Sequence, residues 1–168
     1  HYGFSALPTE KVRSSIGKGI ENLVKGCFPE VASDKIPEIL TYHRELYLKH
    51  PHVDGKIYTG VRETLDTLRK IPGLKVGIAT NKPKPVAVLT LQHYMPGFYF
   101  DVVFGPEDVS KKKPDPAHLL ETLAYLKVKP QEAIYCGDDP VDLKTAEAAQ
   151  VFFLAAGWGF GAVKLDSD

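Results

Sequence analysis

The spacing of hydrophobic positions changes near residue 55. Before that point, apolar residues recur every three or four positions over 9–28 and 33–50, which is typical of amphipathic helices. Gly17, Lys18 and Gly19 interrupt the first segment, and Pro51 ends the second. The first part of the chain therefore predicts helices and no strands.

After residue 55, short apolar runs alternate with segments of helical period. The predicted strands are 74–80, 100–105, 133–137 and 151–156. The predicted helices are 60–73, 84–95, 115–128 and 140–150. This alternation indicates βαβ units, and thus an α/β fold with a Rossmann-like parallel sheet. We expect a small helical domain over 1–55 and the α/β core over 56–168.

Composition restricts the classes of partner. Lys plus Arg and Asp plus Glu both number 21, so the net charge is zero, which argues against nucleic-acid binding and polybasic membrane anchoring. We find no apolar run as long as a membrane span and no secretory leader. Two distant cysteines, Cys27 and Cys136, fit a reducing compartment. These features predict a cytoplasmic protein, with homo-oligomer formation left open.

Polar residues follow two of the predicted strands, at the ends where α/β sheets bind ligands. Thr80 ends the first strand and precedes Asn81, and a hydroxyl beside the N–H groups of a turn can hold a phosphate oxygen. Taken alone, Thr80 is more typical of a cap of the next helix, because caps of this type are common. Lys113 precedes Pro114 and can offset the charge of a phosphate, although a solvated basic loop is an equal alternative.

A third polar group, Asp138, Asp139 and Asp142, follows the strand 133–137. Asp138 and Asp142 lie one helical turn apart, so both can face one spot, where they would repel each other unless a cation joins them. Oxygen ligands in small number suit magnesium. Helix capping explains Asp139 without requiring the other two. With Thr80 and Lys113, these acids indicate phosphoryl transfer at a magnesium site.

The order of Thr80, the sequence KPDP from Lys113, and GDDPVD over 137–142 resembles motifs two to four of the haloacid dehalogenase-like phosphatases. The helical opening with its GKG break resembles the cap of the phosphoglycolate phosphatase branch. The resemblance implies a Rossmann-like core under a helical cap. It also implies magnesium-dependent hydrolysis of a small phosphomonoester through an aspartyl-phosphate.

The resemblance also implies residue roles. Thr80, with the backbone of Asn81, would bind the transferring phosphoryl group, and Lys113 would steady that group and the nucleophile. Asp138 would bind magnesium, supported by Asp142. Lys18, in the GKG turn, would contact the remote end of the substrate.

The family's first motif, D-x-D-G-T, does not occur in the 168 residues. Asp166 and Asp168 have the D-x-D spacing without Gly-Thr, and Asp54-Gly55 lacks the paired acid. We therefore expect the core to lack its first strand, which would leave neighbouring strands with open edges. We also expect it to lack its C-terminal end, because the resemblance implies a further strand and helix after VFFLAAGWGFG over 151–161. The chain itself is expected to be inactive, and the intact parent protein active.

Two other classes of function remain as alternatives. A receiver-type phosphoacceptor domain has a similar sheet and acidic cluster, but places its acids first and its Lys-Pro last, the reverse of the order here. A non-catalytic binding or assembly module on the same fold would also lack the first motif, because a fold does not determine a function.

Overall fold

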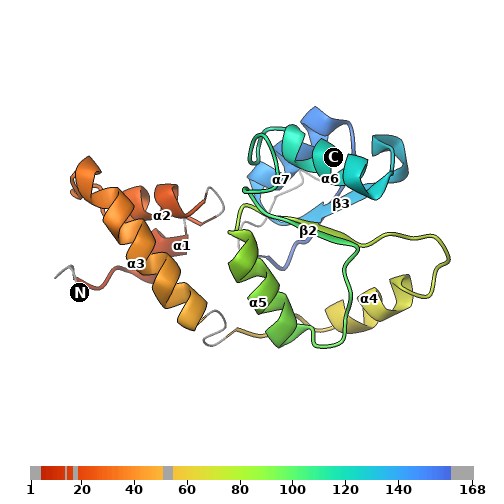
Figure 1. Cartoon of the computed structure of the whole chain (residues 1–168), viewed down its shortest axis with the longest axis horizontal. Helices are drawn as coiled ribbons and strands as arrows, with labels where there is room; N and C mark the ends of the chain where they lie inside the picture. The colour runs from red at the N-terminus through yellow and green to blue at the C-terminus, as the bar shows by residue number, and fades with distance from the viewer. Residues whose placement is uncertain (1–4, 14, 17–18, 51–54, 160–168) are drawn as a thin grey trace.

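The computed structural model of the chain describes residues 5–13, 15–16, 19–50 and 55–159. The first part is helical, as the hydrophobic period predicts, and these helices lie together on one side of the molecule (Figure 1). They are α1 (Thr9–Arg13), α2 (Ile20–Cys27) and α3 (Ile36–Lys49), with a 3-10 turn at Ser33–Lys35 before α3.

The helical part has a small core of its own. Val24 and Cys27 of α2 and Ile36 of α3 are buried where the two helices pack against each other. Gly19 precedes α2 with a φ of 88°, a backbone conformation that glycine adopts without the steric cost of a Cβ. The GKG break seen in the sequence therefore ends at a turn that sets the start of α2.

The α/β part contains the predicted alternation of strands and helices, with strands shorter than the apolar runs. Its helices are α4 (Val61–Leu68), α5 (Lys84–Tyr94), α6 (Ala117–Leu126) and α7 (Pro140–Ala149), with a 3-10 turn at Pro130–Glu132. Its strands are β1 (Gly77–Ala79), β2 (Val102–Phe104), β3 (Ile134–Gly137) and β4 (Phe152–Ala155). None of the helices within the described ranges is long and apolar enough to cross a membrane.

The strands form two parallel pairs. β1 pairs with β2, with Gly77 opposite Val102, and β3 pairs with β4, with Ile134 opposite Phe152. Each pair is joined through a helix, α5 in the first and α7 in the second, as parallel strands require. Within the described residues the two pairs are not hydrogen-bonded to each other, so β1 and β3 each have an open edge.

One face of the β3–β4 pair forms the main core. Leu119 and Leu123 of α6 pack there with Ala149 and Val151, and Tyr135 of β3 contacts this cluster. The opposite face is largely exposed, with 68% of Ile134, 67% of Phe152 and 52% of Leu154 accessible to solvent. Parallel sheets are usually covered on both faces, but the described helices cover only one face of this pair.

His118 of α6 is fully buried beside β2. Its Nε2 lies 3.4 Å from the carbonyl oxygen of Phe104, and because a carbonyl can only accept, Nε2 is the protonated nitrogen. Its Nδ1 is buried and finds no hydrogen-bond partner among the described residues. Burial lowers the pKa of His118 most, and this outweighs the opposing effects of the Phe104 carbonyl, Glu121 and Asp108.

We predict that the His118 imidazole makes the protein less stable below pH 6.5. The unfolded chain binds a proton near pH 6.5, whereas the folded imidazole stays neutral to a lower pH, so stability falls as pH drops through this window. The loss is about 1.4 kcal/mol for each unit by which the pKa is lowered. His118→Gln should flatten the dependence of the unfolding free energy on pH between 6.5 and 5, measured by urea denaturation. The exposed His93 provides the control His93→Gln, which should keep the wild-type slope; equal slopes for wild type and His118→Gln would contradict the prediction.

Candidate active site

Lys113 makes three hydrogen bonds at the open edge between the two strand pairs. Its ammonium donates to Asp142 Oδ1 at 2.6 Å, to Tyr135 Oη at 2.7 Å and to the carbonyl oxygen of Ala79 at 3.1 Å. The side chains of Lys113 and Asp142 are each only 10% exposed. An ammonium with three acceptors has all its protons used, which stabilises a nearly buried charge.

Tyr135 connects the same groups from β3. Its hydroxyl oxygen accepts from Lys113, and its single proton can go to Asp142 Oδ1 at 2.9 Å or to the Ala79 carbonyl at 3.3 Å. Burial raises the pKa of Tyr135 far above its usual value, and the charge of Asp142 raises it further. The hydroxyl therefore stays protonated as a neutral donor.

Asn81 joins the turn after β1 to the loop that contains Lys113. Its Nδ2 donates to the Lys113 carbonyl and its Oδ1 accepts from the Lys113 N–H, both at 3.1 Å. The Asn81 side chain thus fixes the backbone at Lys113. This positioning contact was not predicted from the sequence, from which we expected the Asn81 backbone to contact a phosphoryl group.

Thr80 lies at the end of β1, where the sequence predicts a phosphate contact. Its N–H donates to the Phe104 carbonyl at 3.0 Å, which extends the pairing with β2. Its hydroxyl oxygen accepts from the Lys82 N–H at 3.1 Å, so its own proton can still be donated. Because Lys113 contacts the carbonyl of Ala79, which forms the peptide bond to Thr80, the ammonium and the hydroxyl lie in the same region.

The acidic turn divides into two kinds of carboxylate. Asp139 is the N-cap of α7, and its Oδ1 accepts from the Val141 N–H at 2.8 Å, so the capping explanation is confirmed. Asp142 completes the capping box by accepting from the Asp139 N–H at 3.3 Å, while its other oxygen accepts from Lys113 and Tyr135. Asp142 is therefore held by protein groups on both oxygens.

Asp138 follows β3 and lies against the turn 157–159. A Cβ on Gly159 would overlap the Asp138 carboxylate, so only a glycine fits there without movement. Burial raises the pKa of the Cys136 thiol, and the charges of Asp142 and Asp138 raise it further. Both carboxylates thus lie near the C-terminal end of β3.

The donor atoms at this strand end suit magnesium in part. Mg²⁺ is usually held by one or two carboxylates, with waters and phosphate oxygens completing its shell. Asp138 can supply one such carboxylate, and Asp142 has lone pairs beyond its present contacts. Over the described ranges, no three His, Cys, Asp or Glu side chains converge as a complete metal cage. The residues fit an ion that keeps several of its waters.

The remaining sequence-based candidates have different outcomes. Lys18, Asp54, Asp166 and Asp168 lie outside the described residues. Tyr135 was missed because it lies in an apolar run, where a tyrosine is indistinguishable from a core residue. The only signal was its hydroxyl, which needs a partner when buried.

Comparison with known proteins decides the family. The family model described as haloacid dehalogenase-like hydrolase matches residues 1–156. The chain belongs to this family. A haloacid dehalogenase-like hydrolase of Bacteroides fragilis has the same fold, with a TM-score of 0.81, 29% identity, and coverage of 91% of this chain and 72% of that one.

Two curated relatives of this chain have names that state an activity on phosphate compounds. A phosphoglycolate phosphatase of Nitrosospira multiformis is 34% identical over 175 residues, covering 99% of this chain and 77% of the relative. A pyrophosphatase of Bacillus cereus is 32% identical over 153 residues, covering 90% and 69%. By family resemblance the chain is a phosphoric monoester hydrolase.

The ion pair between Lys113 and Asp142 should be strongly coupled. Lys113→Met leaves a nearly buried carboxylate without its cation, and we expect it to lower the unfolding free energy by about 3–5 kcal/mol. Lys113→Met combined with Asp142→Asn should cost less than the sum of the single changes, by about 1–3 kcal/mol. Urea denaturation measures all three variants. The exposed pair Lys25–Glu21 supplies the control, since Lys25→Met should lower the unfolding free energy far less than Lys113→Met does; strict additivity at Lys113 and Asp142 would contradict the coupling.

Gly159 should control the position of the Asp138 carboxylate. Gly159→Ala forces that carboxylate to move, so we expect about a tenfold loss of magnesium affinity, similar to the effect of Asp138→Asn. Gly157→Ala is the matched control, because a Cβ there meets nothing within 4 Å. Isothermal titration of each variant with MgCl₂ gives the comparison. Equal affinities for the two alanine variants would mean that the turn 157–159 does not position the metal ligand.

Proposed function

We propose that the intact protein hydrolyses a small phosphomonoester in a magnesium-dependent reaction. The observation that supports this most is the Lys113 ammonium, held beside the Ala79–Thr80 peptide at the end of β1. A fixed cation beside a hydroxyl donor suits a phosphoryl group, whose charge spreads over several oxygens.

The described residues have separate roles in this proposal. The Thr80 hydroxyl and the N–H groups of its turn bind phosphoryl oxygens, and Lys113 offsets their charge. Asn81 keeps the Lys113 backbone against that turn. Asp138, supported by Asp142, would hold magnesium, which would supply charge neutralisation for the phosphoryl group.

The covalent step needs an aspartate that faces Lys113. Its carboxylate oxygen would attack phosphorus and break the ester P–O bond, while a second acid protonates the leaving oxygen; water then hydrolyses the aspartyl-phosphate. The motif D-x-D-G-T that provides both acids in this family does not occur in the 168 residues. We therefore assign hydrolysis to the intact protein and expect none from this chain alone.

The substrate class follows from the relatives and from the cap. Relatives named phosphoglycolate phosphatase match nearly the whole chain, so we propose a small phosphorylated metabolite similar to phosphoglycolate. The helices α1–α3 would form the cap, and Lys18 would contact the remote end of the substrate. The free cysteines Cys27 and Cys136 support a reducing, cytoplasmic location.

A non-catalytic module is the second candidate. The exposed apolar face of β3–β4, with Ile134, Phe152 and Leu154, favours it, because such a patch often marks a binding surface. The two candidates differ in ligand: a phosphatase site binds phosphate with magnesium, whereas an assembly module needs neither.

We predict that inorganic phosphate binds to this chain in the presence of magnesium and that Thr80→Val weakens it about tenfold, since a hydrogen bond to a charged group is lost. Thr90→Val is the matched control, because the Thr90 hydroxyl donates within α5 to the Val86 carbonyl. Titration calorimetry measures both. Absence of phosphate binding in every variant would favour the non-catalytic module.

Hydrolysis of an aryl phosphate by the 168-residue chain, abolished by Asp138→Asn, would place the nucleophile within these residues and overturn the assignment to the intact protein.

A further inference from the structure

One polar contact joins the helical part to the turn after β1. The Lys82 ammonium donates to the hydroxyl of Tyr47 in α3 at 3.3 Å and lies 5.2 Å from the centre of its ring. Both side chains are partly buried. A lysine that meets both the hydroxyl and the ring of a tyrosine gains a hydrogen bond and an electrostatic attraction to the aromatic ring.

Lys82 is attached directly to the proposed phosphate turn. Its backbone N–H donates to the Thr80 hydroxyl oxygen, and it follows Asn81 in the chain. A single lysine side chain therefore connects Tyr47 to the backbone that positions Thr80. A movement of α3 away from the core must either break this contact or pull on that turn.

A second lysine faces the helical part from the other side of the site. The Lys112 ammonium lies 3.6 Å from the position of a Cβ on Gly19, and its charge adds to that of Lys25 in lowering the pKa of Glu21 in α2. Lys112 directly precedes Lys113. The helical part thus meets the core where α3 packs against α5 and also at two lysines, each next in sequence to a residue of the candidate active site.

Tyr47 is itself held in place on α3. Its ring lies 5.4 Å from that of His43, one turn earlier, and both line a hollow of about 300 Å³ with Leu46 and His50. Burial lowers the pKa of His43, which favours a neutral ring beside Tyr47. Residues on one face of α3 therefore position the Tyr47 hydroxyl before any ligand binds.

We propose that Tyr47 and Lys82 are positioning residues that latch the helical part onto the phosphate-binding turn. The inference rests on the proposed function for its link to phosphate, whereas the latch itself depends only on the contact between α3 and the turn. In this proposal the turn at Thr80 loses its order whenever the helical part opens. The affinity for phosphate then depends on the fraction of molecules in which the helical part is closed.

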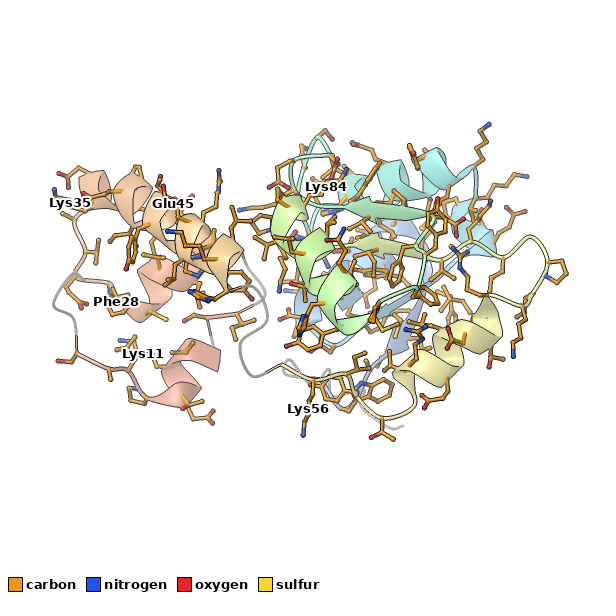
Figure 2. All side chains as sticks on the ribbon, turned by 60° about the horizontal axis from the view of Figure 1, so that its bottom comes forward. Lys11, Phe28, Lys35, Glu45, Lys56 and Lys84 are labelled. Atoms are coloured by element: carbon orange, nitrogen blue, oxygen red, sulfur yellow. The ribbon has the colours of Figure 1, made fainter. Side chains whose placement is uncertain are left out.

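The latch can be tested by spin labels at Glu45→Cys and Glu147→Cys in a Cys136→Ser background. Both positions are exposed, Glu45 lies on α3 (Figure 2), and Cys27 is buried. Without ligand, Tyr47→Phe and Lys82→Met should each raise the ratio of long to short label distances about threefold to tenfold. The double variant should match Lys82→Met, because both changes remove the same contact.

Three further variants separate a latch from general damage. Thr41→Val, on the same helix, should keep the wild-type distances, because the Thr41 hydroxyl donates to the Pro37 carbonyl within α3. Lys82→Arg should restore the closed population, because a guanidinium also donates to the Tyr47 hydroxyl. Unchanged distances in both Tyr47→Phe and Lys82→Met, or additive effects in the double variant, would overturn the latch.

Titration with inorganic phosphate and MgCl₂ then tests the link to the site. Tyr47→Phe should weaken phosphate binding about threefold to tenfold, in proportion to its loss of closed population. Asp138→Asn should weaken the binding of phosphate in the presence of magnesium and leave the ligand-free distances unchanged. Absence of phosphate binding in the wild type would count against the proposed function and the coupling, and the ligand-free distances would still decide the latch. Unchanged phosphate affinity in an opened Tyr47→Phe variant would overturn the coupling alone.

Discussion

The arrangement of the site depends on one nearly buried ammonium. Lys113 can lose most of its water only because three acceptors replace it: a carboxylate from α7, a hydroxyl from β3 and a carbonyl from β1. These acceptors come from positions 22, 29 and 34 residues away in the chain. Removal of any one leaves a charge or a polar group without its partner, so the ends of β1, β3 and α7 are positioned together.

The same network bridges the open edge between the two strand pairs. In a continuous sheet the Ala79 carbonyl would accept from a neighbouring strand, but here it accepts from the Lys113 ammonium, with the Tyr135 hydroxyl also within reach. The strand pairs are thus linked at their C-terminal ends by side chains. Such a link satisfies one carbonyl and leaves the rest of each edge unpaired, so it fixes the site more firmly than it fixes the sheet.

Local sequence patterns predicted the helices and strands. They could not predict the contacts between segments that lie far apart in the chain. Hydrophobic period identified each helix and strand described after residue 55, and helix-capping chemistry identified Asp139. The pairing of Lys113 with Asp142 was not predictable, because it spans 29 residues and depends on how α6 and α7 pack. The role of Tyr135 and the clamp by Asn81 were missed for the same reason. The exposure of one face of β3–β4 could not be predicted either, because Ile134 and Phe152 have the sequence pattern of buried strand residues.

Charge balance explains why two acids one turn apart take different roles. If Asp138 and Asp142 were both unpaired, they would repel each other and any phosphate nearby. Lys113 neutralises Asp142 and thereby lowers the repulsion that an anion beside Thr80 would meet at the strand end. Asp138 follows β3 and lies outside the capping box that Asp139 and Asp142 form, and we propose that a divalent cation at Asp138 would balance the next negative charge. We therefore expect the proposed site to bind cation and phosphate together more tightly than either ligand alone, because each ligand removes the repulsion that the other would meet.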